Sequence, residues 1–418
     1  MSEASQVTAD TPLFRVRNFR LLFSTRVASN TANQMQAVIL GWFIYELTGS
    51  ALALGMISLV QFLPPLLLTL PAGQFADRYD RRLIMRICYA VEAVVSASLL
   101  VLASHATETI MPAIYGLLLV NAVARTFEVP ALTSLMPIMV PRVVLTRAVA
   151  AHASAGRMSM LLGPSVGGLI YTFGGTIAFA AGFVMVVVAF LSCLLLPPAP
   201  KPASKPKITW ENLIGGLTFI RSQPSVLGAM SLDLLATLFG GAATILPIFA
   251  RDILQTGPWG VGVLRSAPAL GGLLTAALLA RYPVKRSAGI VMFAGVTVYG
   301  LGTLLFGLSH WLGLSVLLFL LSGAGDMVAG VIRQSIIQLT TPDHYRGRVM
   351  AVHSLCVSTA GQLGGFESGV TAAWFGAPGS LIFGGFAVFL MVGLWAWKFP
   401  SLREVDRTDE LQPAAVPA

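Results

Sequence analysis

Charged residues are scarce in this chain of 418 residues. Asp, Glu, Lys and Arg together make up only 11% of it, whereas a soluble domain carries about 25%. Hydrophobic residues make up 56%, and the mean hydropathy is +0.78. A water-soluble fold cannot bury so much apolar surface, so the composition excludes a soluble globular protein and indicates an integral membrane protein.

Cysteine is also rare, and the motifs of several enzyme classes are missing. The three cysteines, Cys88, Cys193 and Cys356, lie in apolar segments without metal-ligand spacing, so we expect neither a metal site nor disulfides. There is no phosphate-binding Walker loop, which argues against direct use of ATP, and no cofactor is expected. The 5 histidines are scattered and form no His-Glu-x-x-His motif. A membrane-embedded enzyme is therefore only a remote alternative.

Apolar runs long enough to cross a bilayer, about 20 residues each, recur from Leu21 to Trp397 with short polar breaks. A transmembrane barrel would instead show short alternating segments. The pattern predicts an all-α membrane protein with twelve transmembrane helices. We place them at residues 20–46, 51–71, 83–104, 109–135, 146–172, 176–196, 225–250, 258–280, 288–309, 312–339, 347–373 and 378–398.

Lysine and arginine gather in alternate loops of this map, from Arg15 near one end to Arg407 near the other. The loops between them hold only Arg251. Since cytoplasmic loops carry the excess of these residues, both termini are predicted to be cytoplasmic. The same rule explains the net charge of +9, so we expect no nucleic acid partner. Residues 1–18 lack an apolar core, and no cleavable signal peptide is expected.

A segment rich in proline and lysine, Pro197–Lys207, divides the spans into two sets of six. We expect an extended linker here, followed by a short amphipathic helix over Ile208–Arg221 on the membrane surface. The predicted organisation is an N-terminal six-helix bundle at 1–196, a cytoplasmic linker at 197–224, a C-terminal six-helix bundle at 225–400 and a cytoplasmic tail at 401–418.

The two halves align without a gap over a useful stretch at an offset of 201 residues, which places spans four and five on spans ten and eleven. Arg125 then falls on Asp326, so membrane charges of opposite sign occupy equivalent positions. Two six-helix halves in the same orientation imply a pseudo-two-fold axis along the membrane normal, with a substrate path between the halves. Further coincidences that fix the register are Pro141 with Pro342, Arg147 with Arg348, His152 with His353, Gly163 with Gly364 and Gly168 with Gly369.

The loop after the second span, Gly73–Arg82, reads Gly-Gln-Phe-Ala-Asp-Arg-Tyr-Asp-Arg-Arg. It resembles the signature loop of the major facilitator superfamily, Gly-x-x-x-Asp-Arg-x-Gly-Arg-Arg/Lys, and departs from it at Asp80, where glycine is usual. The resemblance implies a gating loop that latches the two halves together in the outward-open state, although retention of positive charge in the cytoplasm also accounts for the arginines. We expect Asp77 at a helix N-terminus, where the helix dipole favours negative charge. The gating residues carried over are Gly73, Asp77, Arg78, Arg81 and Arg82.

A second motif lies in the fifth span, where Gly163–Gly168 reads Gly-Pro-Ser-Val-Gly-Gly. It resembles the Gly-Pro-x-x-Gly-Gly motif of exporters and antiporters in the superfamily, which implies export. Small residues permit close helix approach, so ordinary tight packing is the alternative interpretation. The motif residues carried over are Gly163, Pro164, Gly167 and Gly168.

Two sequence segments of the first half resemble one branch of the superfamily. Tyr45–Ala51 followed by Gln61–Pro64 looks like the branch that contains enterobactin exporters and macrolide efflux proteins. This resemblance implies a siderophore- or drug-like substrate. Arg125 occupies the place of the family's arginine in the fourth span, but Glu128-Val129 replaces the Gln-Gly that often follows.

Ionisable residues inside the spans are the candidates for coupling and substrate binding. A charge at membrane depth costs about 2.5–3.5 kcal/mol on insertion scales, so each needs a partner, water or a function. The proton-coupling candidates are Asp326, Asp233, Glu92, Glu128 and Arg125. For any of the carboxylates a permanent ion pair, such as Glu128 with Arg125, is an equal alternative.

Candidates for the substrate cavity are polar residues of the first span and three arginines. Asn30, Asn33 and Gln34 lie three to four residues apart and share one helix face; hydrogen bonding between helices is the alternative role. Arg26 and Arg333 lie nearer the predicted cytoplasmic ends and are interpreted as interfacial anchors. The arginines assigned to the cavity are Arg157, Arg265 and Arg333.

These patterns together predict a secondary active transporter: a proton-coupled exporter, or antiporter, that works by alternating access in the bacterial inner membrane. Its expected partners are a small-molecule substrate, protons and the lipid bilayer, and a monomer is expected. An uptake symporter or a lipid flippase on the same fold is the alternative.

The signature loop supplies the first test. Asp77→Asn removes the charge that the latch requires, so transport should fall while expression in the membrane is unchanged. Transport in cells and immunoblotting of membranes measure the two effects. Unchanged transport would remove the latch assignment.

Overall fold

The structure is a computed structural model that describes residues 12–105, 107–198 and 210–407. Across these ranges the chain is helical, with short connections and no strand. It forms two compact units, which do not follow a single cut in the sequence. The first holds Met1–Thr48, Leu63–Ile208 and Gly257–Gly262, and the second holds Gly49–Phe62, Thr209–Thr256 and Val263–Ala418.

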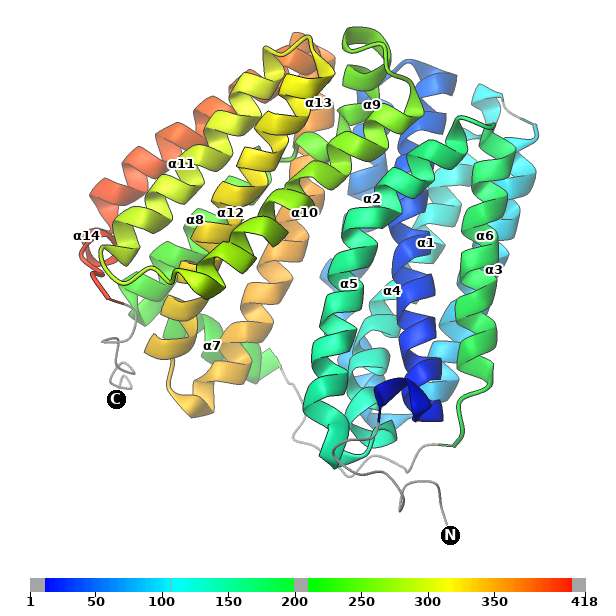
Figure 1. Ribbon diagram of the computed structural model, residues 1–418, viewed down its shortest axis with the longest axis horizontal. Coiled ribbons are helices and arrows are strands. Elements are labelled where there is room, and N and C mark those ends of the chain that lie inside the picture. The colour runs from blue at the N-terminus through cyan, green and yellow to red at the C-terminus, as the bar shows by residue number, and fades with distance from the viewer. Residues whose placement is uncertain (1–11, 106, 199–209, 408–418) are drawn as a thin grey trace. The chain divides into compact units, whose positions relative to one another are not determined.

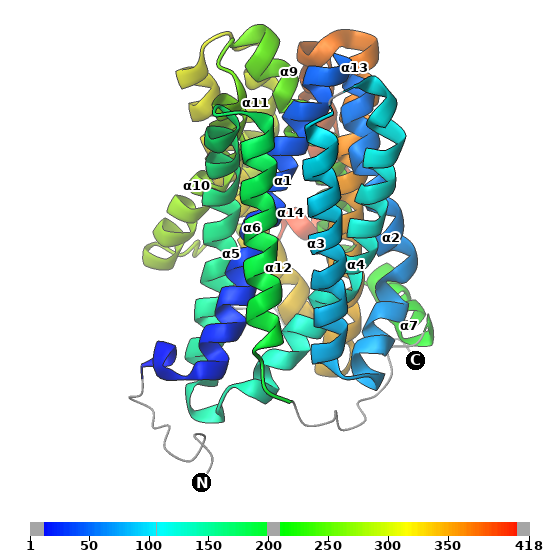
Figure 2. The ribbon, with the colours of Figure 1, turned by 90° about the vertical axis from the view of Figure 1, so that its right-hand side faces the viewer.

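The first unit is built around α1, which packs against α5 and α6, while α3 packs against α4 and α6 (Figures 1 and 2). Its core includes the fully buried Phe19, Tyr89 and Leu132. The helices are α1 (Arg17–Thr48), the part of α2 (Ala51–Arg78) that begins at Leu63, α3 (Arg81–Ala103), α4 (Met111–Met139), α5 (Arg142–Tyr171) and α6 (Gly175–Leu194), with short 3-10 turns η2 (Leu13–Arg15) and η3 (Glu108–Ile110).

In the second unit α11 packs against α12 and α13, and α13 also packs against α7 and α8 (Figure 1). Its core includes Phe219, Met292 and Ile336. The chain reverses inside α13 at Gly376, whose φ of 74° suits glycine alone, so that two spans meet there. The helices are α7 (Trp210–Ser222), α8 (Pro224–Phe239), α9 (Leu246–Ile248), α10 (Pro258–Arg281), α11 (Ala288–Gly307), α12 (Leu312–Thr340), α13 (Asp343–Lys398) and α14 (Pro400–Arg403), with short turns η4 (Ala242–Thr244) and η5 (Phe249–Ile253).

The helix bounds confirm the internal repeat. Each bound of α12 lies 201 positions after the corresponding bound of α4. The next helix begins in the same register, because Pro141 is the N-cap of α5 and Pro342 is the N-cap of α13. Proline is favoured just before or at the first helical position, since its missing N–H costs nothing there. Arg125 and Asp326 thus occupy the same place in equivalent helices.

The seventh predicted span, 225–250, is not one continuous helix. α8 ends at Phe239, and the chain resumes helical form only at Leu246. The break begins at Gly240, whose carbonyl accepts a hydrogen bond from the Tyr299 hydroxyl at 3.0 Å. A Cβ on Gly241 would lie 2.6 Å from the Gly364 backbone. Pro224–Ile253 as a whole is long and apolar enough to be one span, in agreement with the predicted span at 225–250, which contains this break.

In the described ranges, nine helices are long and apolar enough to cross a membrane. That number counts α13 once, and it leaves out α1 and α5, which have 32 and 30 residues but carry charged and polar side chains. The all-α membrane fold is confirmed, while the total of twelve spans stays a prediction.

The predicted linker and tail lie partly beyond the described residues. Of the linker at 197–224, residues 199–209 fall outside, and the predicted surface helix corresponds to α7. Of the tail at 401–418, residues 408–418 fall outside. Its first residues meet the start of α11, where the Ser287 N–H donates to Asp406 Oδ1 at 2.7 Å.

Candidate functional site

The second unit contains a buried three-residue ion cluster, which we call the Asp233 cluster. Asp233 in α8 is 4% exposed and accepts contacts from two other helices. Arg333 Nη2 of α12 lies 2.8 Å from Asp233 Oδ1. His353 Nε2 of α13 lies 3.1 Å from Asp233 Oδ2. Both oxygens of this carboxylate therefore have a partner, as a charge away from water requires.

The first unit contains a second group of buried ionisable residues, the Glu128 cluster. Glu128 in α4 is 1% exposed. Its Oε1 accepts hydrogen bonds from the Tyr89 hydroxyl at 2.7 Å and the Ser29 hydroxyl at 3.0 Å. Its Oε2 lies 3.6 Å from Arg125 Nη1, so the ion pair considered as an alternative forms. Glu92 in α3, 3% exposed, is close enough to Glu128 for the two carboxyls to act on one another electrostatically.

The Glu128 cluster lacks one hydrogen-bond donor. Glu92 Oε1 and Glu128 Oε2 are both buried and have no hydrogen-bond partner in the described part of the chain. Two ionised carboxylates beside one guanidinium also leave one uncompensated negative charge. One proton on either carboxyl would supply a donor and the missing charge.

Asp326 lies in α12, two turns before Arg333, and its side chain is exposed. It is close enough to Arg333 and Asp233 to act on both electrostatically. With Asp326 and Asp233 ionised and Arg333 charged, these groups carry one net negative charge. They therefore also balance with one proton.

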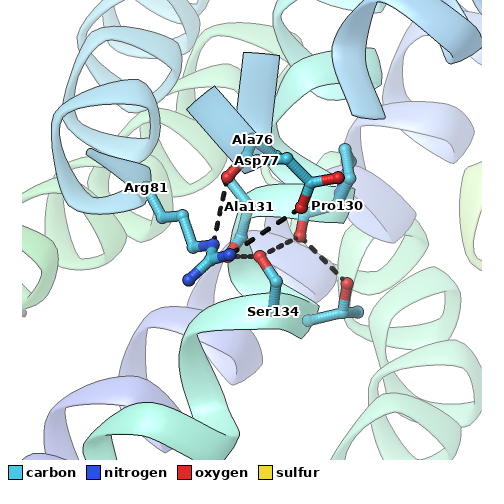
Figure 3. A network of polar contacts seen from close by, with 7 residues as sticks. Ala76, Asp77, Arg81, Pro130, Ala131 and Ser134 are labelled. Atoms are coloured by element: carbon cyan, nitrogen blue, oxygen red, sulfur yellow. Dashed lines mark hydrogen bonds and ion pairs between the residues drawn. The ribbon is translucent and has the colours of Figure 1, made fainter. Parts of the chain in front are cut away.

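The signature loop is held together within the first unit (Figure 3). Arg81 is 4% exposed, donates from Nε to the Ala76 carbonyl at 3.0 Å and lies 3.8 Å from Asp77 Oδ1. Figure 3 shows its guanidinium between the end of α2 and the Pro130–Ser134 segment of α4. Asp77 lies in the last turn of α2, so the expectation that it sits at a helix N-terminus was wrong. Since the helix dipole disfavours a negative charge there, Arg81 supplies the compensation.

Two of the remaining loop residues, Asp80 and Arg82, form hydrogen bonds. Asp80, where the family usually has glycine, is the N-cap of α3 and accepts a hydrogen bond from the Arg82 N–H at 2.9 Å. Arg82 Nη1 donates to the Leu196 carbonyl at 2.9 Å. Arg78 is exposed, and a Cβ on Gly73 would meet no atom within 4 Å. The structure therefore shows a tightly tied turn, and the gating role stays a prediction.

The exporter motif lies where α5 meets two other segments of the first unit. A Cβ on Gly163 would lie 2.5 Å from Gln34 Cβ of α1, and one on Gly167 would lie 2.9 Å from Met35 Cα. A Cβ on Gly168 would lie 2.5 Å from the Pro258 carbonyl. These glycines let helices approach backbone to backbone. α5 runs through Pro164 without interruption.

The substrate-cavity candidates are not all brought together. On α1, Gln34 packs against Gly163 and Asn30 approaches Gly156, so both lie on the α5 side; Asn33 is half-buried. Arg333 belongs to the Asp233 cluster and is not an interfacial anchor. Among the described residues, Arg157, which is exposed, and Arg265, which is half-buried, form no ion pair.

Sequence reasoning missed His353, Tyr89 and Ser29 as members of the two clusters. The partners Asp233 and His353 lie 120 positions apart, and Ser29 lies 99 positions from Glu128. The spacing of neighbouring residues therefore could not indicate these contacts. The internal repeat could indicate His353, because it is equivalent to His152. A histidine at both places inside apolar helices marks a position for polar contact.

Comparison with known proteins identifies the family. The family described as "Transmembrane secretion effector", of the major facilitator type, matches residues 8–417. The chain belongs to this branch of the major facilitator superfamily.

Relatives and solved structures agree with that membership. The chain is 27% identical over 403 residues to the multidrug efflux pump Tap of Mycolicibacterium fortuitum, covering 92% of this chain and 96% of the pump. It is 26% identical over 334 residues to the enterobactin exporter EntS of Escherichia coli O81 (strain ED1a), covering 77% of this chain and 79% of the exporter. The family and its relatives indicate a multi-pass membrane transporter and not an enzyme.

The fold resembles solved transporters. Nucleoside transporter NupG matches with a TM-score of 0.70 and 14% identity over 91% of this chain and 98% of NupG. A bacterial homologue of the human lysosomal transporter Spinster matches with a TM-score of 0.73 and 12% identity over 94% of this chain and 99% of that protein. At this identity the likeness concerns the fold alone.

The buried ion cluster makes a stability prediction. Arg333→Gln leaves the Asp233 charge buried without its closest partner, which should cost about 3 kcal/mol or more. The double variant Asp233→Asn/Arg333→Gln removes both charges and should recover most of that loss. Thermal unfolding of the purified protein in detergent measures each effect.

An exposed ion pair with the same distance between its charged atoms supplies the control. Arg346 and Asp343 also lie 2.8 Å apart, but their side chains are 45% and 89% exposed. Arg346→Gln should cost about 1 kcal/mol or less. Equal losses for Arg333→Gln and Arg346→Gln would show that the Asp233 cluster does not stabilise the fold.

Proposed function

We propose that this protein is a proton-driven exporter of small molecules that works by alternating access. The observation that carries the proposal is the charge balance of two groups of ionisable residues, the Glu128 cluster in the first unit and the Asp233 cluster with Asp326 in the second. Each contains carboxylates and an arginine inside apolar helices, and each balances when one proton binds. Such a group has two states of different charge, which is what coupling to a proton gradient requires.

In the first unit the Glu92–Glu128 pair is the proposed proton site. With the proton bound, the pair and Arg125 are neutral together, which favours a dry environment. When the site opens to water, the proton leaves and the charge of Glu128 is stabilised by the Tyr89 and Ser29 hydroxyls. Arg125 helps the proton to leave, because its positive charge favours the ionised carboxylate.

In the second unit Asp326 and the Asp233 cluster are the proposed partners in coupling. Asp326 is exposed and has no ion pair among the described residues, so a proton has access to it. Asp233 is held by Arg333 and His353, so both of its carboxylate oxygens already have a partner. We assign proton carriage to Asp326 and a positioning role to the Asp233 cluster.

The direction of transport and the class of substrate rest on likeness. The Gly163–Gly168 motif and the relatives, an enterobactin exporter and a multidrug efflux pump, favour export of siderophore- or drug-like molecules. The proposed location is the bacterial inner membrane with both termini cytoplasmic, where a gradient supplies about 2.3 kcal/mol per charge per 100 mV. Uptake by symport and lipid flipping on the same fold are the competing functions.

Inside-out membrane vesicles with a pH-sensitive dye test the proposal. The lumen is acidified, and ethidium or enterobactin is added outside. An exporter should accumulate the compound in the lumen and release protons from it. Glu128→Gln and Asp326→Asn should abolish the proton release, while Glu108→Gln, in the short turn before α4, removes the same charge at a surface position and should leave it intact.

Two outcomes contradict the proposal. Accumulation without any proton release would exclude proton coupling. Proton release in Glu128→Gln and Asp326→Asn as large as in the unaltered protein would exclude these carboxyls as carriers.

A further inference from the structure

Two basic side chains of the first unit, Arg26 and His152, have buried nitrogen atoms without a hydrogen-bond partner among the described residues. Arg26 of α1 has a buried Nε with no hydrogen-bond partner, and both ring nitrogens of His152 in α5 are buried and equally unpartnered within the described residues. Arg26 forms no ion pair there. Buried polar groups are normally hydrogen-bonded, so this arrangement lacks an acceptor.

The two side chains face the same space between α1 and α5. Arg26 is close enough to His152 to act on it electrostatically. Gly156 lies one turn after His152 on the same face of α5. A Cβ on Gly156 would lie 3.7 Å from Arg26 Nη2 and 3.5 Å from Asn30 Nδ2. Donors from Arg26 and Asn30 therefore lie beside a position where α5 has no side chain, and His152 lies one turn before it.

The internal repeat shows which group is missing. His152 and His353 are equivalent at the offset of 201 residues. In the second unit the Asp233 carboxylate contacts this histidine at 3.1 Å. In the first unit His152 has no such acceptor among the described residues, and the charged group that acts on it is the Arg26 guanidinium. The first unit therefore holds donors here and lacks the anion.

We propose that Arg26, Asn30 and His152 form a subsite for the acidic group of the transported molecule. The inference rests on the proposed transport of small molecules and adds the chemical class: an organic anion with a carboxylate. The guanidinium donates to one or both carboxylate oxygens, and Asn30 Nδ2 and one ring N–H of His152 donate to the remaining lone pairs. Gly156 keeps any side chain of α5 out of this position.

Binding of salicylate and its neutral amide, salicylamide, to the purified protein tests the subsite. The two probes share shape and differ in charge, and equilibrium dialysis needs no gradient, so the result is independent of proton coupling. The unaltered protein should bind salicylate about tenfold or more tightly than salicylamide, as expected for a charge-assisted contact. Arg26→Gln should lose this preference. Arg20→Gln, which removes the same charge from an exposed position on the same helix, should keep it.

A second variant leaves all charges in place. Gly156→Leu fills the space beside Arg26 and Asn30, so it should also lose the preference for salicylate, even if Arg26→Gln does not yield folded protein. Size-exclusion chromatography checks the fold of each variant. Equal binding of the two probes by the unaltered protein, or a preference that survives in folded Arg26→Gln or Gly156→Leu, overturns the proposal.

Discussion

The cost of an unpaired charge in an apolar bundle is the constraint on which the rest of this structure depends. Each such charge costs about 2.5–3.5 kcal/mol on insertion scales, so it must find a partner or face water. The chain meets the constraint separately in each unit. Asp233 is paired on both oxygens, and Glu128 receives two hydroxyls and a guanidinium. Protons and substrate are proposed to bind at buried ionisable groups that lack a hydrogen-bond partner among the described residues.

The internal repeat gives two copies of one scaffold with opposite charges at matching places. α4 and α12 have corresponding bounds, yet one carries Arg125 where the other carries Asp326. Because the backbone is duplicated and the charges are not, the two units have different chemistry on similar geometry.

The sequence predicted most of the helices, because bilayer thickness fixes their length and glycine, proline and charge mark their ends. It also singled out Glu128, Asp233 and Arg333, since ionisable residues stand out in apolar spans, while their roles stay predictions. It did not predict the break after Phe239, where Tyr299 donates to the Gly240 carbonyl, or the partnership of Asp233 with His353. Both are contacts between residues 59 and 120 positions apart. Asp77 was assigned to the wrong helix end because the loop extends only from Tyr79 to Asp80.

The shared proton of the Glu92–Glu128 pair is the central claim, and infrared spectroscopy of the purified protein tests it directly. A protonated carboxyl has a carbonyl stretch that a carboxylate lacks. The account predicts this band at neutral pH in the unaltered protein. The band should be lost in Glu92→Gln and also in Glu128→Gln, because either variant leaves one carboxylate balanced by Arg125. A spectrum without the band, or one that both variants leave unchanged, would contradict the account.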